Sequence, residues 1–192
     1  MAELQELFIL KQFTDILDEL DISYAVGGSI ASSIYGNVRF TEDVDISVEN
    51  FSENAEKFYE KTKEDFYLSR DAMQIALHQR TSFNIIHLQT AFKIDIFISK
   101  NTDFDKRILQ RCRKLELAES LNKKFCVVSP EDIIILKLRW YTQGGCISER
   151  QLSDCLGVLQ IQADNLDMNY LKSCSIDLNV NDLLEKLLAE FE

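Results

Sequence analysis

The chain has 192 residues, of which 46% are hydrophobic, and a formal net charge of −11. This length and composition allow one globular domain with a sizeable core and exclude a disordered or fibrous chain. The negative charge argues against nucleic-acid binding driven by bulk electrostatics, because surfaces that neutralise phosphates are normally basic.

Cysteine usage and hydrophobic stretches predict the cellular location. The five cysteines are odd in number and have no CxxC spacing, which is typical of reduced core thiols. The opening residues, MAELQELFILKQF, lack the features of a signal peptide, and no stretch approaches the roughly 18 apolar residues of a membrane span. We therefore expect a cytoplasmic protein that does not cross a membrane.

Hydrophobic spacing predicts helices and strands in the first two thirds of the chain. An amphipathic helix is expected over residues 3–20, and a short strand follows within 21–27. The small residues of SIASSIYG predict a helix packed on a sheet, and DVDISVE alternates as a strand does. Further helices are expected at 52–66, 71–80 and 103–117, an antiparallel strand pair at 82–90 and 92–100, and a strand at 124–128.

A helical part of the chain is expected to begin near Pro130. Ser129 suits a helix cap, proline suits the first helical position, and acidic residues follow at the positive end of the helix dipole. Helices are predicted at 131–143, 148–162, 166–175 and 181–191. The predicted fold class is α+β, with a small mixed β-sheet flanked by helices over 1–128 and a C-terminal helical module over 129–192 packed on this core.

Two carboxylates, Asp43 and Asp45, lie in an otherwise apolar predicted strand. Alternate strand residues share a face, and two like charges held together need a cation or a shared proton. Carboxylates at this spacing suit magnesium, which binds protein carboxylates together with substrate phosphates. If the strand that contains Asp95 lies alongside, three carboxylates converge on a site for in-line phosphoryl displacement. The alternative is that each acid is an ordinary solvent-facing strand residue.

The turn Gly27-Gly28-Ser29 joins a predicted strand to a predicted helix. Backbone N–H groups and a hydroxyl at a helix N-terminus can bind phosphate, although such turns also serve simply as tight connections. A second group is basic and is open to two interpretations, a contact surface for RNA or triphosphate and a solvated helix face; its members are Lys106, Arg107, Arg111, Arg113 and Lys114.

These motifs resemble a known superfamily. Gly28-Ser29, thirteen intervening residues, Asp43-Val44-Asp45-Ile46 and the later Asp95 resemble the signature of the DNA polymerase beta-type nucleotidyltransferases. The run RFTEDVDI is similar to the variant in small bacterial nucleotidyltransferases, which include the abortive-infection toxin type and minimal nucleotidyltransferases. SPEDIIILKLRWY and SERQLSD resemble the later motifs of that group, a helical lysine followed by an arginine–aspartate element.

The resemblance implies an enzyme that moves a nucleoside monophosphate from ATP or another nucleoside triphosphate to a hydroxyl of RNA, protein or a small molecule, releasing pyrophosphate. It implies that Asp43, Asp45 and Asp95 are catalytic and bind one or two magnesium ions. The residues implied for nucleotide binding are Gly27, Gly28, Ser29, Arg39 and Lys137, with Arg150 and Asp154 in support. The alternative is a non-catalytic antitoxin or regulatory module on the same fold, which would bind a partner protein of a toxin–antitoxin pair.

Overall fold

The structure is a computed structural model that describes residues 2–39, 41 and 43–191. The chain divides into two units. The first, called the sheet unit below, comprises Met1–Val26 and Glu42–Val127. The second, the helical unit, comprises Gly27–Thr41 and Val128–Glu192. The segment that follows the first strand therefore belongs with the C-terminal helices. The predicted domain division into 1–128 and 129–192 stays a prediction.

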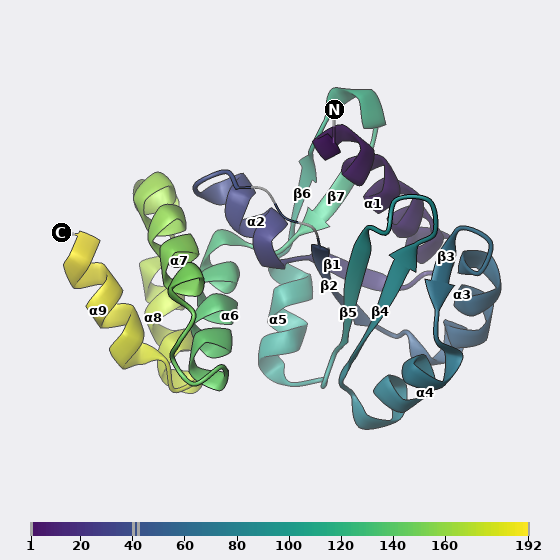
Figure 1. The fold of residues 1–192 in the computed structure, drawn as a ribbon. Coiled ribbons are helices and arrows are strands. Elements are labelled where there is room, and N and C mark those ends of the chain that lie inside the picture. Colours follow the sequence, from purple (N-terminus) through teal and green to yellow (C-terminus); the bar gives the residue numbers. More distant parts are fainter. Residues whose placement is uncertain (1, 40, 42, 192) are drawn as a thin grey trace. The chain divides into compact units, whose positions relative to one another are not determined.

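The sheet unit is built on a mixed sheet, and its strands in the described residues follow the order β3-β4-β5-β2-β1-β7-β6 (Figure 1). The strands are β1 (Ser23–Val26), β2 (Asp43–Glu49), β3 (Phe66–Leu68), β4 (Ser82–His87), β5 (Lys93–Ile98), β6 (Arg113–Glu116) and β7 (Lys124–Val127). Strand β2 pairs with β5 in parallel and with β1 in antiparallel orientation. Strands β4 and β5 pair antiparallel as predicted, and the predicted mixed sheet is confirmed.

Alternation along the strands gives the sheet one buried face. In β2, Val44, Ile46 and Val48 are almost completely buried, whereas the acidic residues between them are partly exposed. The helices of this unit are α1 (Ala2–Glu19), α3 (Ala55–Thr62), α4 (Arg70–Gln79) and α5 (Asp103–Arg111), with 3₁₀ turns at Ser52–Asn54 and Glu119–Leu121. Phe13 of α1 packs edge-on against Phe58 of α3 and Phe66 of β3, so aromatic rings join helices and sheet in the core.

Two parts of the secondary-structure prediction are wrong. The helix predicted over 103–117 ends at Arg111, and Arg113–Glu116 is strand β6, paired antiparallel with β7. Cys112 separates the two with an extended backbone, ψ 143°. The helix predicted over 52–66 ends at Thr62, and Phe66 begins strand β3, paired with β4. In both places pairing with a neighbouring strand outweighs local helical spacing.

The helical unit contains α2 (Gly28–Tyr35), α6 (Pro130–Gln143), α7 (Glu149–Gln162), α8 (Met168–Asp177) and α9 (Asn181–Phe191), with a 3₁₀ turn at Ala163–Asn165. The predicted start of α6 is confirmed, because the Ser129 hydroxyl accepts a hydrogen bond from the Asp132 N–H at 3.2 Å and Pro130 is the first helical residue. Within the described part of the chain, no helix combines the length and apolar character that crossing a membrane requires.

Gly36, the residue that ends α2, lies against the backbone of Gly157 in α7. A Cβ atom on Gly36 would lie 2.8 Å from the backbone carbon of Gly157, a distance that real Cβ atoms do not tolerate. Because the obstacle is backbone and not a flexible side chain, the two segments would have to move apart. The absence of side chains at both positions therefore sets how closely α2 packs on α7.

Gly36→Ala is expected to lower the free energy of unfolding by about 1–3 kcal/mol, the usual cost of overpacking. The measurement is urea unfolding followed by the fluorescence of Trp140, the single tryptophan of the chain, which lies in α6 of the same unit. Ser153→Ala, at an exposed position of α7, is the control and should change stability by less than about 0.5 kcal/mol. Equal stability of Gly36→Ala and wild type would contradict the close approach.

Candidate active site

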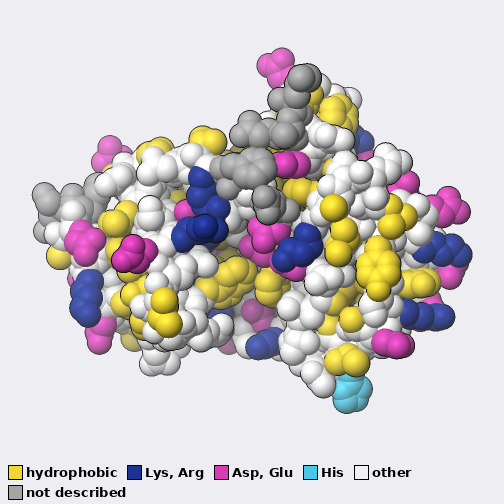
Figure 2. Space-filling model, in the orientation of Figure 1, with side chains coloured by type: hydrophobic (Ala, Val, Ile, Leu, Met, Phe, Trp, Pro, Cys, Tyr) yellow, Lys and Arg dark blue, Asp and Glu magenta, His cyan; other side chains and the backbone are white. Residues whose placement is uncertain are grey.

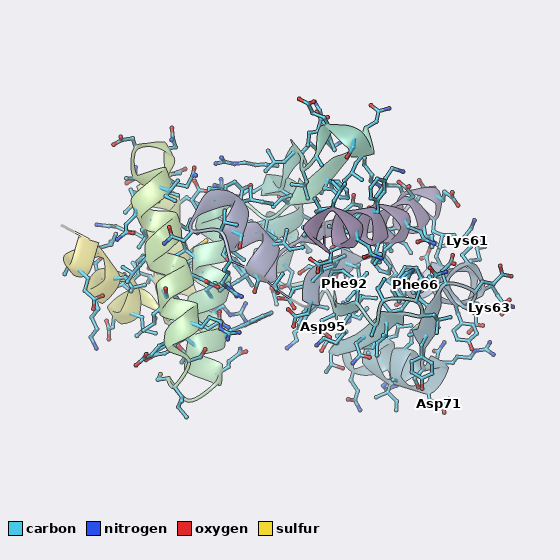
Figure 3. All side chains as sticks on the ribbon, turned by 45° about the horizontal axis from the view of Figure 1, so that its top comes forward. Lys61, Lys63, Phe66, Asp71, Phe92 and Asp95 are labelled. Carbon is cyan, nitrogen blue, oxygen red and sulfur yellow. The ribbon has the colours of Figure 1, made fainter. Side chains whose placement is uncertain are left out.

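Three carboxylates lie on neighbouring strands of the sheet unit. Asp43 and Asp45 occupy the partly exposed positions of β2, so they share a face of the sheet. Asp95 lies at the corresponding position of β5, directly opposite Asp45 in the parallel register. Figure 3 labels Asp95 on this strand. The register therefore places the three acids on one face of two adjacent strands.

Lys93 joins this acidic group from the first position of β5. It lies opposite Asp43 in the register and two residues before Asp95, on the same face as both. Its Nζ atom is 2.7 Å from Asp95 Oδ2 and 3.7 Å from Asp43 Oδ2. The hydrogen bond to Asp95, together with the charges of the nearby acids, raises the pKa of the Lys93 ammonium above its usual value. Sequence reasoning did not single out this residue.

The side chains of this group can supply some, but not all, of the ligands that a hard divalent cation needs. Asp43 and Asp45 offer carboxylate oxygens from one strand face, and magnesium commonly takes one or two protein carboxylates plus substrate phosphates. Asp95 already binds an ammonium. Among the described residues, no three His, Cys, Asp or Glu side chains come together as a metal-binding group. The fit is thus to an ion shared between the β2 pair and a substrate.

The same sheet face continues away from the acids toward β3. In the register, Asn84 of β4 lies beside Asp95, and Ile86 of β4 lies beside both Lys93 and Tyr67 of β3. Tyr67 is 60% exposed. Figure 2 shows hydrophobic side chains among charged ones over β3, β4 and β5. The acids therefore lie on a sheet face that also carries other polar and apolar side chains.

The glycine turn lies in the helical unit, where it begins α2. Gly27 is the residue before the helix and Gly28 is its first residue, with a left-handed φ of 56° that favours glycine. Both glycines are buried, and Ser29 is partly exposed. Gly27 has no side chain with which to cap the helix, so the first turn of α2 lacks a side-chain cap. This turn has the backbone character that phosphate binding at a helix N-terminus requires.

Asp154 of α7 forms ion pairs with two cationic side chains of the same unit. Its carboxylate accepts hydrogen bonds from Lys137 Nζ of α6 at 2.7 Å and from Arg39 Nε and Nη2 at 3.0 and 3.1 Å. The side chains of Lys137 and Asp154 are only 4% and 8% exposed. Arg39 also donates a hydrogen bond to the Ser29 hydroxyl. Four predicted site residues, from the glycine turn to α7, therefore form one connected polar group.

Arg150 does not take part in the contacts described for Asp154. It is exposed in the first turn of α7, whereas Arg39 and Lys137 are the cations that contact the carboxylate. Ser32 of α2 adds a longer contact, 3.4 Å from its hydroxyl to Asp154 Oδ2. The supporting role of Arg150 stays a prediction.

Lowering the pH through the pKa of Asp154 is expected to lower the stability of the helical unit. Burial disfavours the ionised carboxylate, but hydrogen bonds from Arg39 and Lys137 outweigh it and hold the pKa of Asp154 below the usual 3.8. A lowered folded-state pKa contributes stability above the unfolded-state pKa, and this contribution is lost as the pH falls through the folded-state value. Urea unfolding followed by Trp140 fluorescence should show a smaller loss of stability below pH 3.8 for Asp154→Asn than for wild type. Equal losses would contradict this assignment.

The basic residues predicted to share one helix face are divided between two elements. Lys106, Arg107 and Arg111 lie in α5, whereas Arg113 and Lys114 lie in β6. Lys106 and Lys114 line a cavity of about 750 Å³, together with the acidic residues Asp18, Asp21 and Glu49. The cavity wall thus carries both signs of charge, which is not the uniformly basic surface that RNA binding favours.

A family model matches residues 7–181, and its description is "Nucleotidyl transferase of unknown function (DUF2204)". The match covers the glycine turn, the three acids of the sheet and the Lys137–Asp154 pair. Among curated proteins, the sequence comparison found no significant match.

Solved structures show the same fold at low sequence identity. The antibiotic-resistance factor ANT(2'')-Ia in solution matches with a TM-score of 0.58 and 11% identity, and the match covers 100% of each chain. Its crystal structure in complex with adenylyl-2''-tobramycin matches with a TM-score of 0.56 and 11% identity over 91% of this chain and 97% of that one. An antigenic nucleotidyltransferase-like protein from Paracoccidioides brasiliensis matches with a TM-score of 0.55 and 17% identity over 95% and 91%.

Proposed function

We propose a reaction for this chain from the family to which it belongs, the nucleotidyl transferase family matched by residues 7–181. On this proposal, the protein transfers a nucleoside monophosphate from a nucleoside triphosphate to an acceptor hydroxyl, and pyrophosphate leaves. The observation that carries the proposal is the register of β2 and β5, which aligns Asp45 with Asp95 on a sheet face that also presents Asp43.

The acids have distinct roles in this reaction. Asp43 and Asp45 hold a divalent ion, which supplies charge stabilisation for the phosphoryl oxygens when it is bound. Asp95 orients the acceptor hydroxyl and accepts its proton, so that the hydroxyl oxygen can attack the α-phosphorus. The new bond joins that oxygen to the α-phosphate, and the bond between the α- and β-phosphates breaks. In-line displacement of this kind depends mainly on positioning and electrostatic stabilisation.

The polar group of the helical unit is proposed to bind the triphosphate. Lys137 and Arg39 supply two cations, Ser29 supplies a hydroxyl, and the N-terminus of α2 supplies backbone N–H groups. Asp154 holds both cations in the absence of nucleotide and thereby fixes their positions. Phosphate oxygens would then bind donors that are already ordered, which lowers the entropic cost of binding.

The experiment compares two labels in the same nucleoside triphosphate. Purified protein is incubated with magnesium, each of the four triphosphates and acceptor fractions of RNA, protein and small molecules, including aminoglycosides. Label at the α-phosphate should appear on an acceptor, and label at the γ-phosphate should appear only in pyrophosphate. Transfer of the γ-label would indicate a kinase reaction, and no transfer of either label to any fraction would remove the support for the proposal.

The non-catalytic alternative makes a different prediction. An antitoxin or regulatory module would capture its partner protein even after Asp43, Asp45 and Asp95 are replaced by Asn. Partner capture that survives in this triple variant, together with no transfer of α-label by wild type, would favour this alternative.

A further inference from the structure

Lys93 lies within the acidic group. A second metal ion at this place would compete with its ammonium for the carboxylates of Asp43 and Asp95. Lys93 Nζ bridges two carboxylates from adjacent strands, at 2.7 Å from Asp95 Oδ2 and 3.7 Å from Asp43 Oδ2. The register explains this position, since Lys93 lies opposite Asp43 and two residues before Asp95. The ammonium is therefore placed by the sheet itself and not by a flexible loop.

The burial of these groups favours the contact with Asp95 over that with Asp43. The side chain of Asp95 is 23% exposed, that of Lys93 is 38% exposed and that of Asp43 is 44% exposed. The shorter and better shielded pair is the stronger, because solvent screens an exposed ion pair more effectively. Asp95 is thus the principal partner of Lys93, and the side chain of Asp43 is the more exposed of the two acids.

We infer that Lys93 is a resident cation that takes the place of one metal ion, so that this site binds a single divalent ion at Asp43 and Asp45. The inference rests on the proposed function. A second divalent ion between Asp43 and Asp95 would lie beside the ammonium or expel it, and both arrangements are unfavourable. Lys93 then orients Asp95 as a positioning residue, with no metal on Asp95.

The number of bound ions tests this inference without any measurement of activity. Equilibrium dialysis with Mn²⁺ and α,β-methylene nucleoside triphosphates, which cannot transfer their nucleotide, counts the ions held by each chain. Wild type is expected to bind one nucleotide-dependent ion. Lys93→Met, which keeps the aliphatic stem and removes the charge, is expected to bind two, and Lys93→Arg, which keeps the charge, is expected to bind one.

Two further variants locate the ions. Asp45→Asn should lose the wild-type ion, and Asp95→Asn added to Lys93→Met should return the count from two to one. Asn84→Ala, which changes a neutral neighbour of Asp95 on β4, is the control and should leave one ion. Circular dichroism spectra verify that each variant is folded.

Two ions on wild type, or one ion on folded Lys93→Met, would overturn the inference and leave the proposed function in place. Equal binding by wild type and Asp45→Asn, with no nucleotide-dependent ion on either, would overturn the proposed function as well.

Discussion

Asp45→Asn is expected to lower the rate of nucleotide transfer by about a thousandfold, because loss of metal-based charge stabilisation is worth several kcal/mol in the transition state. Asp45 lies beside Asp95 on the shared sheet face, and the amide that replaces it keeps the size of the side chain. The fold should therefore persist. The measurement is the transfer of α-labelled nucleotide, together with the thermal stabilisation that wild type gains from metal and nucleotide.

Glu49→Gln is the matched control for this variant. Glu49 occupies the same alternating set of β2 positions, four residues further along, and the chemical change is again carboxylate to amide. It should leave the transfer rate within about twofold of wild type, since Glu49 lies at the other end of the strand. If both variants lost activity equally, the general negative charge of the strand and not a specific site would explain the effect.

The shared face of Asp43 and Asp45 could be predicted from the sequence, whereas the pairing of their strand with β5 could not. Alternation along DVDISVE places Asp43 and Asp45 on one face whatever the fold, because successive strand residues point to opposite sides. The alignment of Asp45 with Asp95 depends on parallel pairing of β2 and β5, two strands fifty residues apart. Hydrophobic spacing identifies strands and does not say which strands pair. For the same reason nothing in the sequence indicated that Lys93 lies beside Asp43.

The partner of Asp154 could not be predicted from spacing along the chain. Arg150 is one helical turn before it and is the natural local choice, since residues four apart face each other on a helix. Arg39 is 115 residues away in sequence, yet it donates two hydrogen bonds to this carboxylate. Packing of the segment after α2 in the helical unit decides this contact. The resemblance named Arg39, Lys137 and Asp154 and did not say that Asp154 pairs with the other two.

Asp154→Ala is expected to lower the free energy of unfolding of the helical unit by about 3 kcal/mol or more, because it leaves the almost fully buried Lys137 ammonium without its carboxylate. Arg39 would lose the same partner but is more exposed, and it can turn to solvent at less cost. Urea unfolding followed by Trp140 fluorescence measures the change where it arises, since Lys137 and Trp140 both lie in α6.

Lys137→Met separates the cost of an unpaired charge from the cost of lost packing. Methionine fills much of the volume of the lysine stem without its charge, so the double variant Lys137→Met, Asp154→Ala should be more stable than Asp154→Ala alone. The size of this recovery measures the penalty that the unpaired ammonium imposes. If the double variant were less stable by the sum of the two single losses, the pair would contribute independently and Asp154 would not hold Lys137 in place for phosphate binding.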